Sequence, residues 1–181
     1  MKTALLLIDI QNDYFPGGKM ELTGSEKAAN NAERILARFR QNKDLVIHIR
    51  HLSVREDAAF FIPNTPGAEI HECLEPLAEE KIITKHFPNS FIHTELLSIL
   101  QQQQIEHLVV AGMMTHMCVD ATVRAAKDLG FTIELIGDAC ATKELELNGR
   151  KLKAEDVHAS FLSALNYFYS NVVTTTAYLR K

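Results

Sequence analysis

Three side chains in this sequence could together carry out nucleophilic chemistry: those of Asp9, Lys85 and Cys118. A thiolate attacks carbonyl carbon, a carboxylate can accept the thiol proton, and an ammonium can orient the carboxylate and favour the charged state. Cys118 follows an apolar run and a turn at the expected start of a helix, whose N–H groups would stabilise a thiolate or an oxyanion. In the structural alternative, Cys118 is a small buried residue, and Asp9 and Lys85 form a simple ion pair.

The elements between these residues must bring them together, because they are 76 and 33 positions apart in the chain. Short apolar runs alternate with amphipathic stretches, which predicts alternating strands and helices. Strands are predicted at 4–10, 45–49, 81–84, 106–111, 131–136 and 171–175, and helices at 26–41, 91–102, 119–129 and 155–169. Residues 53–76 contain three prolines and Gly67, and we expect a long loop there that could line a site.

The apolar strands predict an α/β fold in a single domain over residues 1–181. Strands that are apolar throughout are buried on both faces, and their alternation with helices indicates a mostly parallel sheet between two helical layers. Ligands bind beyond the carboxyl ends of such strands. Asp9, Lys85 and Cys118 follow or end predicted strands, so we expect them to share one edge of the sheet.

Composition restricts the classes of function. The chain has 181 residues, 46% of them hydrophobic and 23% charged, with a formal net charge of −4, which disfavours nucleic-acid binding. The apolar run near the N-terminus stops at Asp9, and no other run is long enough for a membrane span, so we expect a cytoplasmic protein without membrane contact. Three cysteines without a Cys-x-x-Cys pair disfavour a disulfide framework and a zinc ribbon.

The eight histidines do not form a recognisable metal motif. His48 and His51 flank a strand end and His86 follows Lys85, but none belongs to a tight ligand pair. We therefore expect no metal and no cofactor. The alternative is a metal held by His51, His86 and a carboxylate of the long loop. His116 lies in the turn before Cys118 and is a candidate pocket residue.

Four segments resemble the motifs of the isochorismatase-like cysteine hydrolases. Residues 9–15 read Asp-Ile-Gln-Asn-Asp-Tyr-Phe, similar to the family's opening Asp-x-Gln-x-Asp-Phe signature. Residues 85–91 resemble its lysine motif, and residues 112–119, Gly-Met-Met-Thr-His-Met-Cys-Val, look like its nucleophile turn. Residues 138–142 are similar to the segment after the fifth strand. The resemblance spans nearly the whole chain, in order.

The resemblance implies a six-stranded parallel sheet with helices on both faces and a catalytic triad of Asp9, Lys85 and Cys118. It also implies a cis peptide between Met113 and Met114, which would turn the Met114 N–H toward the Cys118 N–H to form an oxyanion hole. Nicotinamidases of this family bind a metal through an Asp-x-His pair and a further His. The matching positions here are His51, Ser53 and Phe60, which argues against nicotinamidase activity and a pocket metal.

We expect a metal-independent amidohydrolase that cleaves an amide or related C–N bond of a small molecule through a Cys118 thioester. Two alternatives remain: an isochorismatase-type vinyl-ether hydrolase with Asp9 as the acid, and a binding protein that only retains the fold. Isochorismatases generally lack the cysteine, and a scaffold has no need for all three triad residues. The expected assembly is a homo-oligomer, a dimer or tetramer. The candidate pocket walls are Tyr14, Phe60, Phe61 and Phe87.

Overall fold

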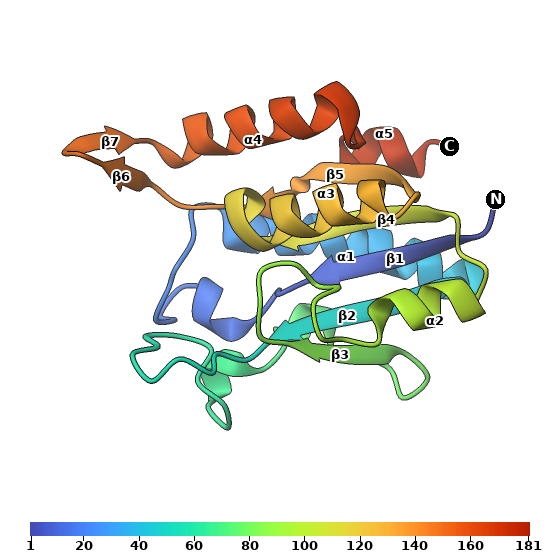
Figure 1. The fold of residues 1–181 in the computed structure, drawn as a ribbon, viewed down its shortest axis with the longest axis horizontal. Helices are drawn as coiled ribbons and strands as arrows, with labels where there is room; N and C mark the ends of the chain where they lie inside the picture. Colours follow the sequence, from blue (N-terminus) through green and yellow to red (C-terminus); the bar gives the residue numbers. More distant parts are fainter.

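The computed structural model covers residues 1–181 and folds them into three layers around one six-stranded sheet (Figure 1). Every neighbouring pair in the sheet is parallel, and the strand order is β3-β2-β1-β4-β5-β8. This architecture confirms the predicted fold class. The strands are β1 (Thr3–Ile8), β2 (Leu45–His51), β3 (Lys81–Lys85), β4 (His107–Met113), β5 (Thr132–Ala141) and β8 (Asn171–Val173).

Helices cover both faces of the sheet and bury two separate apolar clusters. One face carries α1 (Ser25–Asn42) and α5 (Thr175–Leu179), and the other carries α2 (Leu96–Gln102), α3 (Asp120–Asp128) and α4 (Ala154–Phe168) (Figure 1). The strand β1 shows why both clusters form. Leu5 and Leu7 pack on the α1 side, whereas Leu6 and Ile8 pack on the other side, because successive side chains of a strand point to opposite faces.

The segment predicted as a helix over 91–102 becomes helical only from Leu96. Side chains before that point hydrogen-bond to the backbone and hold a series of turns. The Phe91 N–H donates to Asn89 Oδ1, and Thr94 Oγ1 donates to the Ser90 carbonyl. Such local side-chain bonds compete with helical hydrogen bonds. The apolar periodicity of this segment therefore predicted too long a helix.

A two-stranded hairpin and a short helix were absent from the sequence prediction. A hairpin of β6 (Leu145–Leu147) and β7 (Arg150–Leu152) projects from the sheet edge (Figure 1). Its turn residues Asn148 and Gly149 both have positive φ, the conformation that an Asn-Gly pair favours in two-residue hairpins. The short α5 is capped by Thr174, whose side chain accepts from the Ala177 N–H.

The long loop between β2 and β3 is irregular, as predicted, apart from two short 3-10 turns at Pro66–Ala68 and Glu72–Leu74. A third 3-10 turn, Asn12–Tyr14, follows β1. Gln11 joins the two regions, because its Nε2 donates to the carbonyls of His51 and Ala68. No helix combines the length and the apolar character that a membrane span requires.

The strand order reverses at the centre of the sheet: β2 and β3 lie on one side of β1, and β4, β5 and β8 lie on the other. β1 pairs with β2 on one side and with β4 on the other, so a crevice forms where their carboxyl ends diverge. Gly112 lies opposite Ile8 in this pairing and has a φ of 145°. A Cβ at Gly112 would lie 2.2 Å from the Ile8 carbonyl oxygen, so the two strands can approach this closely only with glycine at that position.

Candidate active site

Asp9, Lys85 and Cys118 meet at the carboxyl edge of the sheet, as the strand pattern predicted. The Lys85 ammonium lies 2.8 Å from Asp9 Oδ2 and donates to Cys118 Sγ at 3.2 Å. All three residues are buried, with exposed fractions of 0%, 1% and 4% for Asp9, Lys85 and Cys118. A carboxylate and an ammonium in such a setting stabilise one another, because each would be costly to bury alone.

Backbone geometry turns Asp9 toward this edge. We predicted a first strand that continues to residue 10, but β1 ends at Ile8 and Asp9 has a φ of 52°. Aspartate adopts this left-handed conformation more readily than most residues. The Asp9 N–H still donates to the Ile49 carbonyl of β2, which fixes the chain as it leaves the sheet.

Lys85 reaches the site because β3 is in register with β2, so that Lys85 lies opposite His51. Its ammonium lies 2.9 Å from His51 Nδ1 and donates to the Phe87 carbonyl at 3.0 Å. Together with Asp9 and Cys118, these contacts surround the ammonium on several sides. The lysine is therefore the polar centre of the site.

Cys118 lies in a π-helical turn, Thr115–Val119, that precedes α3. The helical segment therefore begins before position 119, where we predicted its start. Thr115 anchors the turn, since its Oγ1 donates to the Ala141 carbonyl of β5 at 3.1 Å. The peptide bond between Met113 and Met114, which leads into the turn, is cis.

Burial raises the pKa of the Cys118 thiol strongly, and the nearby Asp9 carboxylate raises it further. The Lys85 ammonium acts in the opposite direction but does not compensate. For Lys85, burial lowers the pKa, but Asp9 and Cys118 outweigh this effect and hold the pKa above its ordinary value. The resting site therefore contains a charged lysine and a neutral thiol. The stable thiolate expected from the start of a helix is not what this environment favours.

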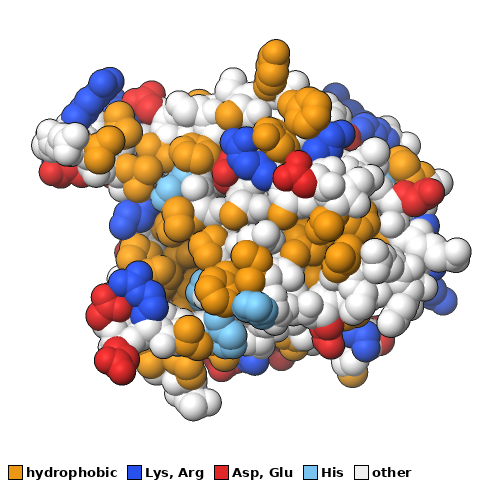
Figure 2. Space-filling view, viewed as in Figure 1, with side chains coloured by type: hydrophobic (Ala, Val, Ile, Leu, Met, Phe, Trp, Pro, Cys, Tyr) orange, Lys and Arg blue, Asp and Glu red, His pale blue; other side chains and the backbone are white.

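A cavity of about 390 Å³ opens above Cys118. Most of its wall is apolar, and Figure 2 shows hydrophobic side chains with histidines beside them on the left of the view, where the strands end. Tyr14 and Phe60, two of the predicted wall residues, line it together with Met114 and Cys118. Its other lining residues are His51, Ser53, Val54, Arg55, Asp57, Ala58, Ala59, His86, Pro88 and Met117.

The other three predicted pocket residues do not line this cavity. Phe61 is buried behind the wall, where its ring packs edge-on against Tyr14 and Phe60. Phe87 is 42% exposed, and its ring packs against His93. Only its backbone carbonyl contacts Lys85. His116 turns away to contact Thr142 Oγ1 through Nδ1 at 2.5 Å.

Residues of the Asp-x-Gln-x-Asp segment support the cavity wall, although the sequence did not single them out. Gln11 is fully buried and fixes the backbone of His51, since its Oε1 accepts from the His51 N–H at 2.7 Å. Asp13 Oδ2 accepts from the Phe61 N–H at 2.7 Å and so holds the loop between β2 and β3 in place. They are the Gln and the second Asp of the opening signature, and that match is the sequence signal that could have identified them.

A metal ion would have to compete with Lys85 for the most suitable position. Ligand atoms of Asp9, His51 and Cys118 lie within 4.8 Å of one another, a spacing that could hold a cation. The Lys85 ammonium already contacts all three residues, at 2.8, 2.9 and 3.2 Å. His86, a ligand in the alternative metal site, instead contacts the Leu52 carbonyl through Nδ1, at 2.8 Å.

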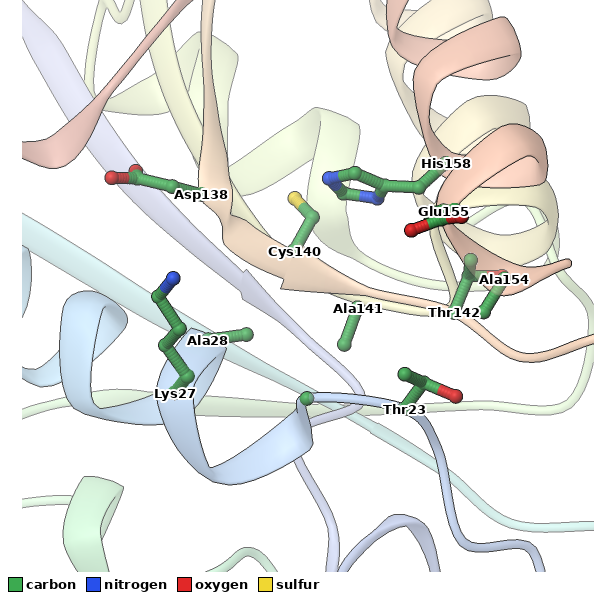
Figure 3. Close-up of a pocket in the computed structure, with 11 residues that line it drawn as sticks. Thr23, Lys27, Ala28, Asp138, Cys140, Ala141, Thr142, Ala154, Glu155 and His158 are labelled. Atoms are coloured by element: carbon green, nitrogen blue, oxygen red, sulfur yellow. The ribbon is translucent and has the colours of Figure 1, made fainter.

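A second cavity, of about 270 Å³, lies between the starts of α1 and α4. Figure 3 shows Lys27 of α1 on one side of the end of β5 and His158 of α4 on the other, with Cys140 between them. Two of the polar side chains there have partners within the protein. Asp138 Oδ1 accepts from the Thr175 N–H, and His158 Nδ1 contacts Thr115 Oγ1. Burial raises the pKa of Cys140 to about 12, and its thiol donates to the Ile136 carbonyl, whereas the Cys118 thiol has the Lys85 ammonium beside it.

Comparison with known proteins identifies related chains along almost the whole length. A family model described as the isochorismatase domain matches residues 3–177. The uncharacterized isochorismatase family protein YddQ of Bacillus subtilis is 51% identical over 99% of this chain and 100% of its own length. A crystal structure of an isochorismatase hydrolase from Oleispira antarctica has a TM-score of 0.95 and 45% identity, and it covers 99% of this chain and 97% of that one.

More distant relatives have the names of particular hydrolases. Streptothricin hydrolase of Streptomyces noursei is 32% identical over 78% of this chain and 50% of its own length. Maleamate amidohydrolase of Pseudomonas putida is 26% identical over 96% of this chain and 83% of its own length.

Proposed function

This chain belongs to the isochorismatase family of hydrolases, and on that premise we propose that it cleaves an amide or related C–N bond of a small molecule through a thioester on Cys118. The observation that carries the proposal is the position of the Lys85 ammonium, which contacts both Asp9 and Cys118 next to a largely apolar cavity. The name of one relative, maleamate amidohydrolase, agrees with this choice of bond.

In the first half of the reaction, Asp9 removes the proton from the Cys118 thiol as the sulfur attacks the substrate carbonyl carbon. A base is needed because burial keeps the thiol protonated at rest. The Lys85 ammonium stabilises the thiolate as it forms, since it already donates to Sγ. The tetrahedral adduct then collapses: the C–N bond breaks, Asp9 returns its proton to the leaving amine, and an acyl thioester remains on Cys118.

In the second half, water replaces the amine in the cavity. Asp9 takes a proton from the water, the resulting hydroxide attacks the thioester carbonyl, and the C–S bond breaks. The thiolate leaves and recovers a proton from Asp9, which restores the resting site and releases a carboxylic acid. One water is consumed for each amide cleaved, and no oxidant or reductant is required.

The oxyanion of both tetrahedral adducts needs hydrogen-bond donors. We assign this role to the N–H groups of Met114 and Cys118, because both residues line the cavity at the nucleophile turn. Backbone donors held in a water-poor cavity stabilise developing negative charge without reorganisation. Tyr14 and Phe60 would pack against the body of the substrate.

The proposal is tested by screening small primary amides for ammonia release by the wild-type protein, Cys118→Ala and Cys73→Ala. Cys73 is a matched control because its thiol lies outside the cavity, beside His71. Cys118→Ala should lower turnover by a factor of about 10³ or more, and Cys73→Ala should retain it. Acid-quenched wild-type enzyme should carry an added acyl mass on the peptide that contains Cys118. Retained turnover in Cys118→Ala would exclude the thioester mechanism.

The family name also motivates a second assay, for release of pyruvate from isochorismate. In that reaction Asp9 would protonate a vinyl ether, and no thiol would be required. Pyruvate release that is equal in the wild type and Cys118→Ala would favour this alternative. Binding of small molecules without turnover in either assay would instead favour a non-catalytic role.

A further inference from the structure

His51 presents one ring nitrogen to the catalytic lysine and has no partner in the chain for the other. The Lys85 ammonium lies 2.9 Å from His51 Nδ1, and an ammonium can only donate hydrogen bonds. Nδ1 must therefore be the acceptor, so the proton of the neutral ring is on Nε2. No side chain or backbone group of the protein accepts from this Nε2–H, and His51 lines the cavity.

The position of the His51 ring is fixed by its surroundings. The Gln11 side chain forms two hydrogen bonds with the His51 backbone: it accepts from the N–H at 2.7 Å and donates to the carbonyl at 2.9 Å. The Phe61 ring packs against the imidazole, with 5.9 Å between the ring centroids. The side chain is only 17% exposed. The Nε2–H is therefore a pre-oriented donor, whose direction need not be fixed when a ligand binds.

The imidazole is neutral at ordinary pH. Burial lowers the pKa of His51 to about 4, and the Lys85 charge acts in the same direction. This agrees with the geometry, because a charged ring would place a second proton on Nδ1 and against the ammonium. The donor is consequently an uncharged N–H, suited to a neutral acceptor.

The charged side chains at the cavity rim and those beneath Cys118 form two separate pairs. Asp9 lies against Lys85, and at the rim Arg55 donates to both carboxylate oxygens of Asp57, at 3.0 and 2.7 Å. The rest of the wall is mainly apolar. This arrangement offers no free charge to bind an ionic substrate, and it favours a neutral, compact molecule with an apolar body.

We propose that His51 is a specificity-determining residue whose Nε2–H donates a hydrogen bond to an acceptor atom next to the scissile carbonyl of a neutral carboxamide. The proposal rests on the function proposed above. The acceptor must lie close to the carbonyl, because His51 and Cys118 contact the same ammonium. Substrates of this class include carboxamides with a ring nitrogen or an ether oxygen adjacent to the carbon that bears the amide.

A site with a buried donor discriminates against an analogue that lacks the acceptor, because the donor then loses its hydrogen bond to water without replacement. We expect about a 10- to 100-fold preference in kcat/KM for the acceptor-bearing member of an isosteric pair. Two pairs provide the test: picolinamide with benzamide, and methoxyacetamide with butanamide. In each pair, a nitrogen or oxygen acceptor replaces a carbon of similar size.

The preference should disappear in His51→Leu and return in part in His51→Gln, whose amide N–H can donate from a similar position. The ratio between the two members of a pair is informative even if a variant is less stable, since both members are affected equally. Ser53→Ala is the matched control, because it removes another polar side-chain group from the cavity wall and leaves His51 in place. This variant should keep the preference.

A wild-type ratio near one, a ratio that survives His51→Leu, or its loss in Ser53→Ala would each overturn the assignment. If no amide releases ammonia, the proposed function fails, and calorimetry with Cys118→Ala then tests His51 separately. The same ratio should appear in the dissociation constants of each pair and vanish when His51→Leu is added. Equal affinities, or no binding of any of the four amides, would contradict the role of His51.

Discussion

At the residue scale, the Lys85 ammonium has more neighbours than it has protons. It contacts Asp9, His51, Cys118 and the Phe87 carbonyl within 3.2 Å. Neither Asp9 oxygen has a well-aligned hydrogen-bond donor, although Oδ2 lies 2.8 Å from the ammonium. The carboxylate is therefore neutralised but incompletely hydrogen-bonded, which leaves it free to accept a proton from the thiol.

Asp9→Asn should lower kcat by about 10³-fold, because an amide cannot accept the thiol proton. It should also lower the thermal unfolding temperature, since the buried Lys85 ammonium loses its counter-charge. Turnover is measured on protein shown to be folded by near-ultraviolet circular dichroism. Asp156→Asn, an exposed substitution of the same type on α4, is the control and should leave both quantities unchanged. Near-wild-type kcat in Asp9→Asn would assign the base to another group.

His51 should make the protein acid-sensitive. Its pKa is about 4 in the folded state and about 6.5 when unfolded, so on acidification the unfolded chain binds the proton first. The contribution of His51 to stability is therefore constant above pH 6.5 and falls between pH 6.5 and pH 4. The wild type should lose about 3 kcal/mol more than His51→Gln over this interval, as measured by urea unfolding at each pH. Parallel curves for the two proteins would contradict the prediction.

At the element scale, strand pairing determines which residues meet. The pairing of β2 with β3 sets Lys85 beside His51, and the pairing of β1 with β4 brings the start of the nucleophile turn beside Asp9. The π-turn between β4 and α3 then directs Cys118 into the crevice. A shift of one residue in either pairing would reverse the faces of the side chains and separate the triad.

Gly112→Ala should be far more damaging than an ordinary glycine substitution. The new Cβ would lie 2.2 Å from the Ile8 carbonyl oxygen in the neighbouring strand. We expect a loss of about 3 kcal/mol or more in the free energy of unfolding, together with lost activity. Gly130→Ala is the control, because that residue also has positive φ but has open space around it. Its cost should be about 1 kcal/mol, and equal losses in the two variants would show that the strand contact is unimportant.

At the scale of the whole molecule, the candidate site lies at the carboxyl ends of the strands, and the helical layers on both faces of the sheet support it. Both apolar clusters reach the cavity, since the first includes Tyr14 and Met114 and the second includes Cys118. The expectation of a homo-oligomer remains a prediction, which light scattering on the purified protein would test.

Activity of the whole protein should survive treatment with EDTA or dipicolinate and should not rise with added zinc, iron or manganese. The reason is the Lys85 ammonium, which contacts Asp9, His51 and Cys118 where a cation would otherwise bind. Ser53 and Phe60, at the positions of the other nicotinamidase ligands, offer no imidazole. Elemental analysis provides the measurement. About one equivalent of tightly held metal, with activity lost on removal and restored on return, would contradict a metal-free mechanism.

The sequence by itself determined the architecture and the identity of the candidate triad. Continuous apolar runs that alternate with amphipathic segments specify a buried parallel sheet, because only burial on both faces suits such strands. Residues that follow those strands must then share one edge, which is why Asp9, Lys85 and Cys118 could be placed together. The competition between side-chain and helical hydrogen bonds was harder to predict. Bonds from the side chains of Asn89 and Thr94 to the backbone replaced the first turn of a helix that the periodicity predicted.

The tertiary structure decided the protonation of the site and the composition of the cavity wall. The pattern of residues suggested a stabilised thiolate at Cys118, whereas burial raises the pKa of the thiol. It also suggested that Phe61, Phe87 and His116 line the pocket. In the structure Phe61 is buried in the core, Phe87 packs at the surface against His93, and His116 contacts Thr142. The pattern also gave no indication that His51 contacts Lys85. Desolvation and side-chain direction depend on neighbours distant in sequence, and only the folded chain specifies those neighbours.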